Sequence, residues 1–245
     1  MTYARHELVD DVETLPRMPP WVTSGRPETS EDVAFLSGAA LSHLHLVLNR
    51  EEVPQSLLRS RLALRAAEAC VRFSGRPERA EELRDAVHLL RPGDLPGPAG
   101  ETYLSWRRAV ERPVSVKALH RALPGIGEVQ LAQWLDAGKG APVTHAAMVL
   151  ETVLTSAPRQ EVLALILADA VLSKALGWNQ LVPMLVSGLK HADLRNRGGD
   201  LRLACLCAVT KPAIEASRLS AELARRAAHL KAVAPKLRAK CAGRR

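Results

Sequence analysis

Aromatic residues are scarce in this chain, and their scarcity narrows the fold classes that it can adopt. Only 3% of its 245 residues are Phe, Trp or Tyr, although 47% are hydrophobic. Leu and Ala must therefore fill most of the core. Both favour helices, whereas the aromatic and β-branched residues that favour strands are few. The composition predicts an all-α fold.

The patterns that mark common catalytic and metal sites are also missing. The sequence holds no GxxxxGK[ST], HExxH or GxSxG and no GxGxxG after a strand. Two pairs of metal-binding residue types are two positions apart, a spacing that separates side chains by about 200° on a helix and prevents chelation: His43 with His45, and Cys205 with Cys207. We therefore expect no metal and no cofactor, and an enzyme is the least favoured class without being excluded.

Long apolar runs are absent as well. The longest, at positions 162–168, is too short to cross a bilayer. The first residues are acidic and lack the apolar stretch of a signal peptide. We expect a cytoplasmic protein with reduced thiols and no membrane contact.

What the chain does have is a strongly uneven charge distribution. Its net charge is +8. The stretch 218–245 holds nine basic residues and one acid, Glu222, so it accounts for the whole excess, and residues 1–217 are neutral. A concentrated basic end attracts polyanions such as nucleic acid or an acidic protein.

Prolines, glycines and capping residues divide the chain into helices. An irregular arm is expected at 1–28, with Trp21 pinning it to the body, then a single helical domain at 29–234 and a basic tail at 235–245. Roughly ten helices form a compact bundle, and the stretch 91–100, with three prolines and three glycines, is a loop and a candidate sub-boundary. The expected helices are 29–50, 54–75, 77–90, 101–112, 115–123, 128–137, 142–156, 158–176, 179–192, 200–212 and 213–234, with Pro212 stopping or kinking the chain between the last two.

The turn at 123–127 resembles a helix-hairpin-helix element. Its Pro-Gly-Ile-Gly sequence joins two short helices, and Gly125 and Gly127 would let a phosphate approach the second helix's free N–H groups. The carboxylate of Glu128 would repel a phosphate bound at this turn, and Leu131 occupies a position where the helix-hairpin-helix pattern has a small residue. An ordinary helical corner is the alternative.

Two acidic positions are further candidates for a site. Asp169 lies within the most apolar helix and needs a partner, for which Arg61, Arg65 and Lys174 are available. A structural salt bridge is favoured over a catalytic acid. Asp94, in the proline-rich loop, either belongs to a site or closes a turn.

Several long segments together resemble an uncharacterised bacterial family, domain of unknown function 1403. They are EDVAFLSGAAL, RLALRAAEACVRFSGRPERAEELRDAVHLLRPGDLPGPAG, LADAVLSKALGW and GDLRLACLCAVTKPAIEASRLSAELARRAAHLKAVAPKLRAK. The resemblance spans about 31–240 and implies a bacterial, soluble context, with no established activity. Other members extend beyond the APKLRAK segment, so the resemblance leads us to expect that a terminal piece is missing here.

Two functions follow as hypotheses. The first is a nucleic-acid-associated protein that contacts phosphates through Gly125, Gly127 and six basic residues, namely Arg225, Arg226, Lys231, Lys236, Arg238 and Lys240. The second is an interaction module whose last helix docks an acidic partner. A basic face continuous with the 125–127 turn would favour the first, and a groove or exposed apolar patch beside the last helix would favour the second.

Overall fold

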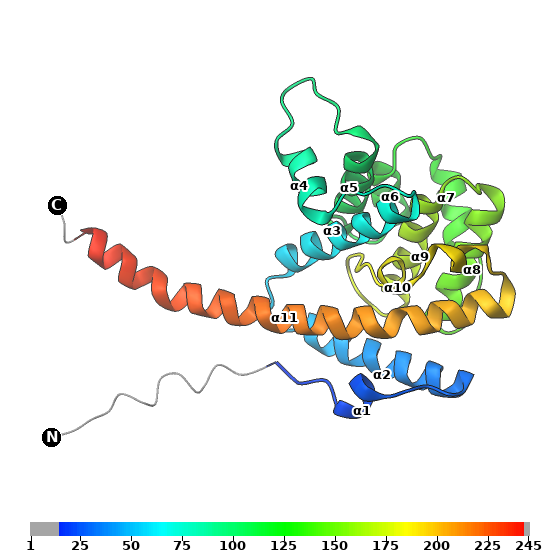
Figure 1. Ribbon diagram of the computed structural model, residues 1–245, viewed down its shortest axis with the longest axis horizontal. Coiled ribbons are helices and arrows are strands. Elements are labelled where there is room, and N and C mark those ends of the chain that lie inside the picture. Colours follow the sequence, from blue (N-terminus) through cyan, green and yellow to red (C-terminus); the bar gives the residue numbers. More distant parts are fainter. Residues whose placement is uncertain (1–14, 243–245) are drawn as a thin grey trace.

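The computed structural model describes residues 15–242, and side chains from Leu15 to Pro235. Within that range the protein is all-α, as predicted (Figure 1). Its helices are α1 Pro20–Ser24, α2 Ser30–Leu48, α3 Gln55–Phe73, α4 Ala80–His88, α5 Gly97–Val110, α6 Val116–Ala122, α7 Glu128–Leu135, α8 Pro142–Ser156, α9 Glu161–Ala175, α10 Leu185–Gly188, the 3-10 helix η1 His191–Arg195 and α11 Gly198–Ala242. Helix α5 begins inside the predicted loop 91–100, because Pro98 suits its first turn.

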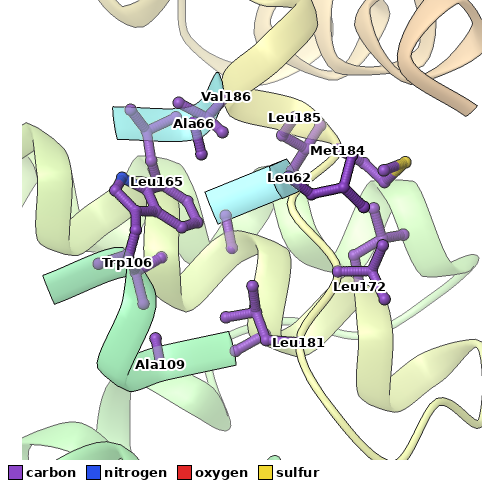
Figure 2. Close-up of a cluster of buried hydrophobic side chains, with 14 of the residues drawn as sticks. Leu62, Ala66, Trp106, Ala109, Leu165, Leu172, Leu181, Met184, Leu185 and Val186 are labelled. Atoms are coloured by element: carbon purple, nitrogen blue, oxygen red, sulfur yellow. The ribbon is translucent and has the colours of Figure 1, made fainter. Parts of the chain in front are cut away.

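The centre of the core is α9, which is apolar nearly all round and buried from Leu163 to Ser173. Side chains of α3, α5, α9 and the segment after α9 meet in one cluster (Figure 2). Trp106 of α5 is fully buried there, and its indole N–H donates to the Sγ of Cys70 on α3 at 3.3 Å. The few aromatic residues thus anchor a core that Leu and Ala fill.

The helix predicted at 179–192 does not form, and that prediction was wrong. Residues 181–184 have no regular secondary structure and are followed by the short helices α10 and η1. Pro183 explains the difference, because it cannot donate to a helix and disfavours helical geometry at Val182 before it. The apolar residues 181–186 are nevertheless all buried, so this irregular segment is part of the core.

The prediction of two helices, one ending at Pro212 and one ending at 234, was also wrong, since α11 runs as one helix through both Pro212 and Pro235. Proline at 212 removes the amide that would bond the carbonyl of Ala208. Gly188 of α10 lies against that carbonyl so closely that a Cβ on Gly188 would collide with it. An α-hydrogen of Gly188 therefore faces the Ala208 oxygen, which is the geometry of a weak C–H···O contact.

Helix α2 and the N-terminal arm lie on the outer side of α11 (Figure 1). A capping box begins α2: the Thr29 hydroxyl accepts from the Asp32 N–H at 3.1 Å, and the Asp32 carboxylate accepts from the Thr29 N–H at 3.0 Å. In the described part of the arm, Leu15 and Val22 are buried. Trp21, expected to pin the arm, stacks on Phe35 but stays half exposed.

Candidate partner-docking groove

The C-terminal part of α11 extends beyond the body of the protein (Figure 1). Its buried residues reach from Leu201 to Ala224, and none of the described residues after Ala224 is buried. Three of the predicted site residues, Arg225, Arg226 and Lys231, are exposed on it. The other three on this helix, Lys236, Arg238 and Lys240, lie outside the residues whose side chains are described.

A groove of about 830 Å³ runs beside α11 where the helix leaves the body. The N-terminal arm forms one wall and α11 the other, with His43 of α2 and Glu52 also at its surface. Its apolar lining comes from both walls: Leu15, Pro16, Met18, Ile214, Ala221, Ala224 and Ala228. The groove thus joins segments that are some 200 positions apart in the sequence.

Arginines outnumber acids around this groove. Arg17, Arg218 and Arg225 line it, against one carboxylate, that of Glu52. Within the described part of the chain, neither Arg218 nor Arg225 is paired with an acid, whereas Arg226, outside the groove, forms an ion pair with Glu222 at 2.6 Å. An apolar trough flanked by guanidinium groups suits a ligand with both apolar and anionic groups.

His43 fixes the arm to α2 within the groove. Its Nε2 lies 3.0 Å from the carbonyl oxygen of Pro16, to which it donates a hydrogen bond in the tautomer protonated at Nε2. Its Nδ1 is buried and has no hydrogen-bond partner among the described residues. In that tautomer Nδ1 is a buried acceptor that no described residue satisfies.

The 125–127 turn lies elsewhere in the fold. Gly125 has φ +97°, and the Nδ1 of His120 lies 2.8 Å from the Ile126 carbonyl, which fixes the turn. Gly127 caps α7 with no side-chain hydrogen bond, and Glu128 lies in the first turn. Helices α6 and α7 lie across the body from the projecting end of α11 (Figure 1), so the turn and the basic end form no continuous face.

Asp169 is fully buried, but the salt bridge predicted for it is absent. One carboxylate oxygen accepts from the Met184 and Leu185 N–H groups at 3.0 and 2.8 Å, and the other lies 3.5 Å from the Val186 nitrogen. Burial raises the pKa of Asp169 from 3.8 to about 7, although the backbone donors oppose that rise by favouring the carboxylate. The carboxyl group of Asp169 therefore caps α10 and organises the irregular core segment.

The proline-rich loop shows no convergence with Asp169. The Asp94 carboxylate accepts from the Arg91 N–H at 3.1 Å, and the Asp94 N–H donates to the Arg91 carbonyl at 3.0 Å. Asp94 thus closes a turn on the surface, while Asp169 is enclosed in the core. These two acids cannot act on one substrate.

The histidine and cysteine pairs point apart, as their spacing predicted. His43 faces the arm, whereas His45 accepts from the Trp178 indole N–H at 3.1 Å. Cys205 is buried and Cys207 exposed. Burial raises the pKa of both Cys70 and Cys205 to about 12, which disfavours the reactive thiolate. No cluster of three potential metal ligands occurs among the residues that the structure describes.

The family of proteins of unknown function DUF1403 matches residues 6–245 of this chain. The chain belongs to the DUF1403 family. The resemblance noted in the sequence is thereby confirmed, and the match covers the groove and the whole of α11. No curated protein and no solved structure matches this DUF1403 protein. In the described range, none of its helices is long and apolar enough to cross a membrane.

The groove is the feature that sequence reasoning missed. The arm contributes Leu15 and Met18 from a proline-rich stretch without periodicity, and no local signal links them to α11. Of the predicted residues whose side chains are described, only Arg225 lines the groove.

Proposed function

We propose that this protein is a helical interaction module that docks an acidic segment of a partner protein in the groove beside α11. The observation that carries the proposal is the groove itself, which combines an apolar lining with Arg17, Arg218 and Arg225. Apolar contacts supply affinity, and the arginines select for carboxylates and speed the encounter. The 125–127 turn lies away from the projecting end of α11 (Figure 1), so it lends no support to a shared phosphate-binding face.

The occupant that fits is a short amphipathic segment. Its apolar residues would face Ile214, Ala221 and Met18, and its carboxylates would reach Arg218 and Arg225. These two arginines are seven positions apart on α11, about two helical turns or 10 Å along its axis. A helix with acids at the same spacing would match them.

The test uses a labelled synthetic helix rich in Leu and Glu, with a matched peptide carrying Lys in place of Glu. We expect the acidic peptide to bind and the basic one to fail, with fluorescence anisotropy as the readout. The double variant Arg218→Glu, Arg225→Glu should weaken binding by about 100-fold, since each lost pair at a partly exposed site is equivalent to about a factor of ten.

The control variant reverses an equal number of charges outside the groove, Arg226→Glu with Lys231→Glu. It should change affinity for the acidic peptide by only a few-fold, through long-range attraction. Equal losses for the two double variants would mean that net charge alone attracts the peptide, and the docking proposal would then be wrong.

A second candidate function is phosphate-backbone binding by the end of α11. The specific observation in its favour is that Glu222 is the last acid of the chain, while all six predicted basic residues follow it in the same helix. Nonspecific affinity from such contacts falls steeply with salt. The turn with Gly125 and Gly127 would be a separate contact.

Titration of a DNA duplex at two salt concentrations tests this candidate. Deleting residues 235–245 removes three of the six predicted contacts, so affinity at low salt should fall and its dependence on salt should become shallower. A chain that fails to bind at low salt, or that binds equally well after the deletion, would rule it out.

A further inference from the structure

The outer face of α2 is uncharged although it is exposed. Between Asp32 and Arg50 the chain has no Asp, Glu, Lys or Arg. Helix α2 packs on α11, and its buried side includes Leu36, Ala40 and Leu44. The opposite side exposes Phe35 and Leu46, which are 65% and 58% accessible, with Gly38, Ala39 and Ser42 between them.

Trp21 of α1 extends the exposed apolar face of α2. Trp21 of α1 stacks on Phe35 with ring centroids 5.3 Å apart, and half of the Trp21 side chain stays accessible. The protein has only two Phe and four Trp, so one of each lies in this exposed pair. A helix that is apolar on every side is normally covered on every side, and a cluster of exposed apolar side chains marks an interaction surface.

The order of residues along α2 is self-complementary when the helix is read backwards. Glu31, Phe35, Ala39, Ser42 and Leu46 follow one another on α2 at spacings of three or four, so they share a face, and Arg50 comes two residues after the helix ends. In an antiparallel pair of α2 helices centred between positions 40 and 41, Phe35 lies level with Leu46, and Ala39 with Ser42. At each end Glu31 lies level with Arg50.

We propose that a second copy of this chain packs on the outer face of α2, with the two α2 helices antiparallel about a twofold axis. Such an isologous contact uses the same patch on both subunits. The small residues Gly38, Ala39 and Ser42 let the helix backbones approach, while Phe35 and Leu46 fill the space on either side.

Charge favours a second copy over another occupant and fixes its direction. A parallel pair would bring Glu31 against Glu31 and Arg50 against Arg50, whereas the antiparallel pair places opposite signs together at both ends. The Arg50 side chain pairs with Glu52 of its own chain at 3.0 Å and keeps 33% accessibility, so it can also reach the second subunit. A strongly charged partner would meet no countercharge between the two ends.

The consequence for the proposed function is bivalency. Each α2 rests on the α11 of its own chain, so the dimer holds two grooves in one assembly. A partner with two acidic segments would gain avidity without new contacts.

Sedimentation equilibrium of the full chain over a range of concentrations tests the proposal, and we expect a reversible dimer. Phe35→Glu should weaken the dimer by on the order of 100-fold, because it places two carboxylates in an apolar contact. The matched control is Val129→Glu on α7, whose side chain is 73% accessible, and it should leave the association unchanged.

Gly38→Leu separates the interface from the fold. A Cβ on Gly38 would meet no atom of the chain within 4 Å, so the subunit should unfold at the same temperature or higher, since leucine favours a helix more than glycine does. The added side chain would hold the two helices apart, and the dimer should weaken about tenfold or more.

A charge exchange tests the direction of the pair. Glu31→Arg alone and Arg50→Glu alone should each weaken the dimer several-fold, and the double exchange should restore it. Three outcomes would each overturn the proposal as stated. They are a wild-type chain that stays monomeric, a Phe35→Glu dimer as tight as wild type, and a double exchange that does not restore the dimer. Binding of the acidic peptide to Phe35→Glu should be retained, so failure of the dimer and failure of the docking groove give different results.

Discussion

Asp169 shows how a single buried carboxyl can hold an irregular segment inside a helical core. It accepts from the backbone N–H groups that begin α10, while Ser173, one turn later, accepts from the Val182 N–H at 3.0 Å. Two polar side chains of α9 thus satisfy donors that have no helical or strand partner. Without them these N–H groups would be buried without acceptors, at a cost of about 1–3 kcal/mol each.

The raised pKa of Asp169 predicts a specific dependence of stability on pH. The carboxyl titrates near 3.8 in the unfolded chain and near 7 in the folded protein. Between those values the folded state binds more protons than the unfolded state, so the free energy of unfolding falls as pH rises from about 4 to about 7 and loses no more above that range. The stabilising contribution is therefore complete below pH 3.8.

Urea unfolding of wild type and Asp169→Asn at about pH 5 and about pH 8 measures this effect. Wild type should lose more stability than the variant on going to pH 8, because the asparagine does not titrate. The variant should be less stable at both pH values, since its amide lacks the second acceptor oxygen. Parallel losses in the two proteins would show that Asp169 does not titrate in this range.

At the scale of elements, α10 and α11 depend on each other through one close contact. Pro212 leaves the Ala208 carbonyl without its usual amide donor, and Gly188 is small enough to lie directly against it. Pro235 is easier to accommodate, because it and the residue before it are exposed and water can reach the backbone of α11. Helix α11 thus accommodates Pro212 through a contact inside the body and Pro235 through exposure to water.

Gly188→Ala tests the contact between these helices. The added methyl group would collide with backbone of α11, which cannot move away as a flexible side chain can, so we expect a loss of about 1–3 kcal/mol in the free energy of unfolding. Gly199→Ala is the matched control, because the nearest atom to its Cβ would be 3.9 Å away at the end of the Arg202 side chain. Urea unfolding should show no loss for the control. Equal stability of both variants would mean that the helices can separate without penalty.

At the scale of the whole molecule, α11 has two parts with different roles. The first part, to Ala224, is core structure, since it packs on α2, α8 and α10. The second part carries exposed basic residues away from the body, and of the groove lining it contributes only Arg225 and Ala228. The stretch up to Ala224 thus supports the fold and also lines most of the α11 side of the groove, whereas no described residue after Ala228 is buried.

Removing residues 229–245 tests that division. The described residues of this stretch, up to Pro235, are exposed except for Val233, which is half-buried, and Ala228 is the last residue that lines the groove. We expect the free energy of unfolding to change by less than about 1 kcal/mol, while affinity for a DNA duplex falls if the second candidate function holds. A large loss of stability would show that the projecting part supports the fold.

The sequence by itself determined the helical class, most of the helices and the place of the charge. Local causes suffice for these features: the Thr29 cap, the apolar periodicity of α3 and α8, and the cluster of basic residues after Glu222 act over a few positions of the chain. The same local reasoning failed at 179–192, where Pro183 outweighs the periodicity, and at Pro212, where α11 continues through the proline and the freed Ala208 carbonyl faces Gly188 of a distant segment.

Only the tertiary structure decided what these helices bring together. The groove forms only when residues 15–23 lie beside residues 214–228. The Asp169 carboxylate binds backbone N–H groups, which no pattern of side chains in the sequence predicts. The outer face of α2 also became visible only after packing, because a helix apolar on every side has the same sequence whether it is fully buried or half exposed. Burial depends on contacts between distant segments, and those contacts are a property of the fold as a whole.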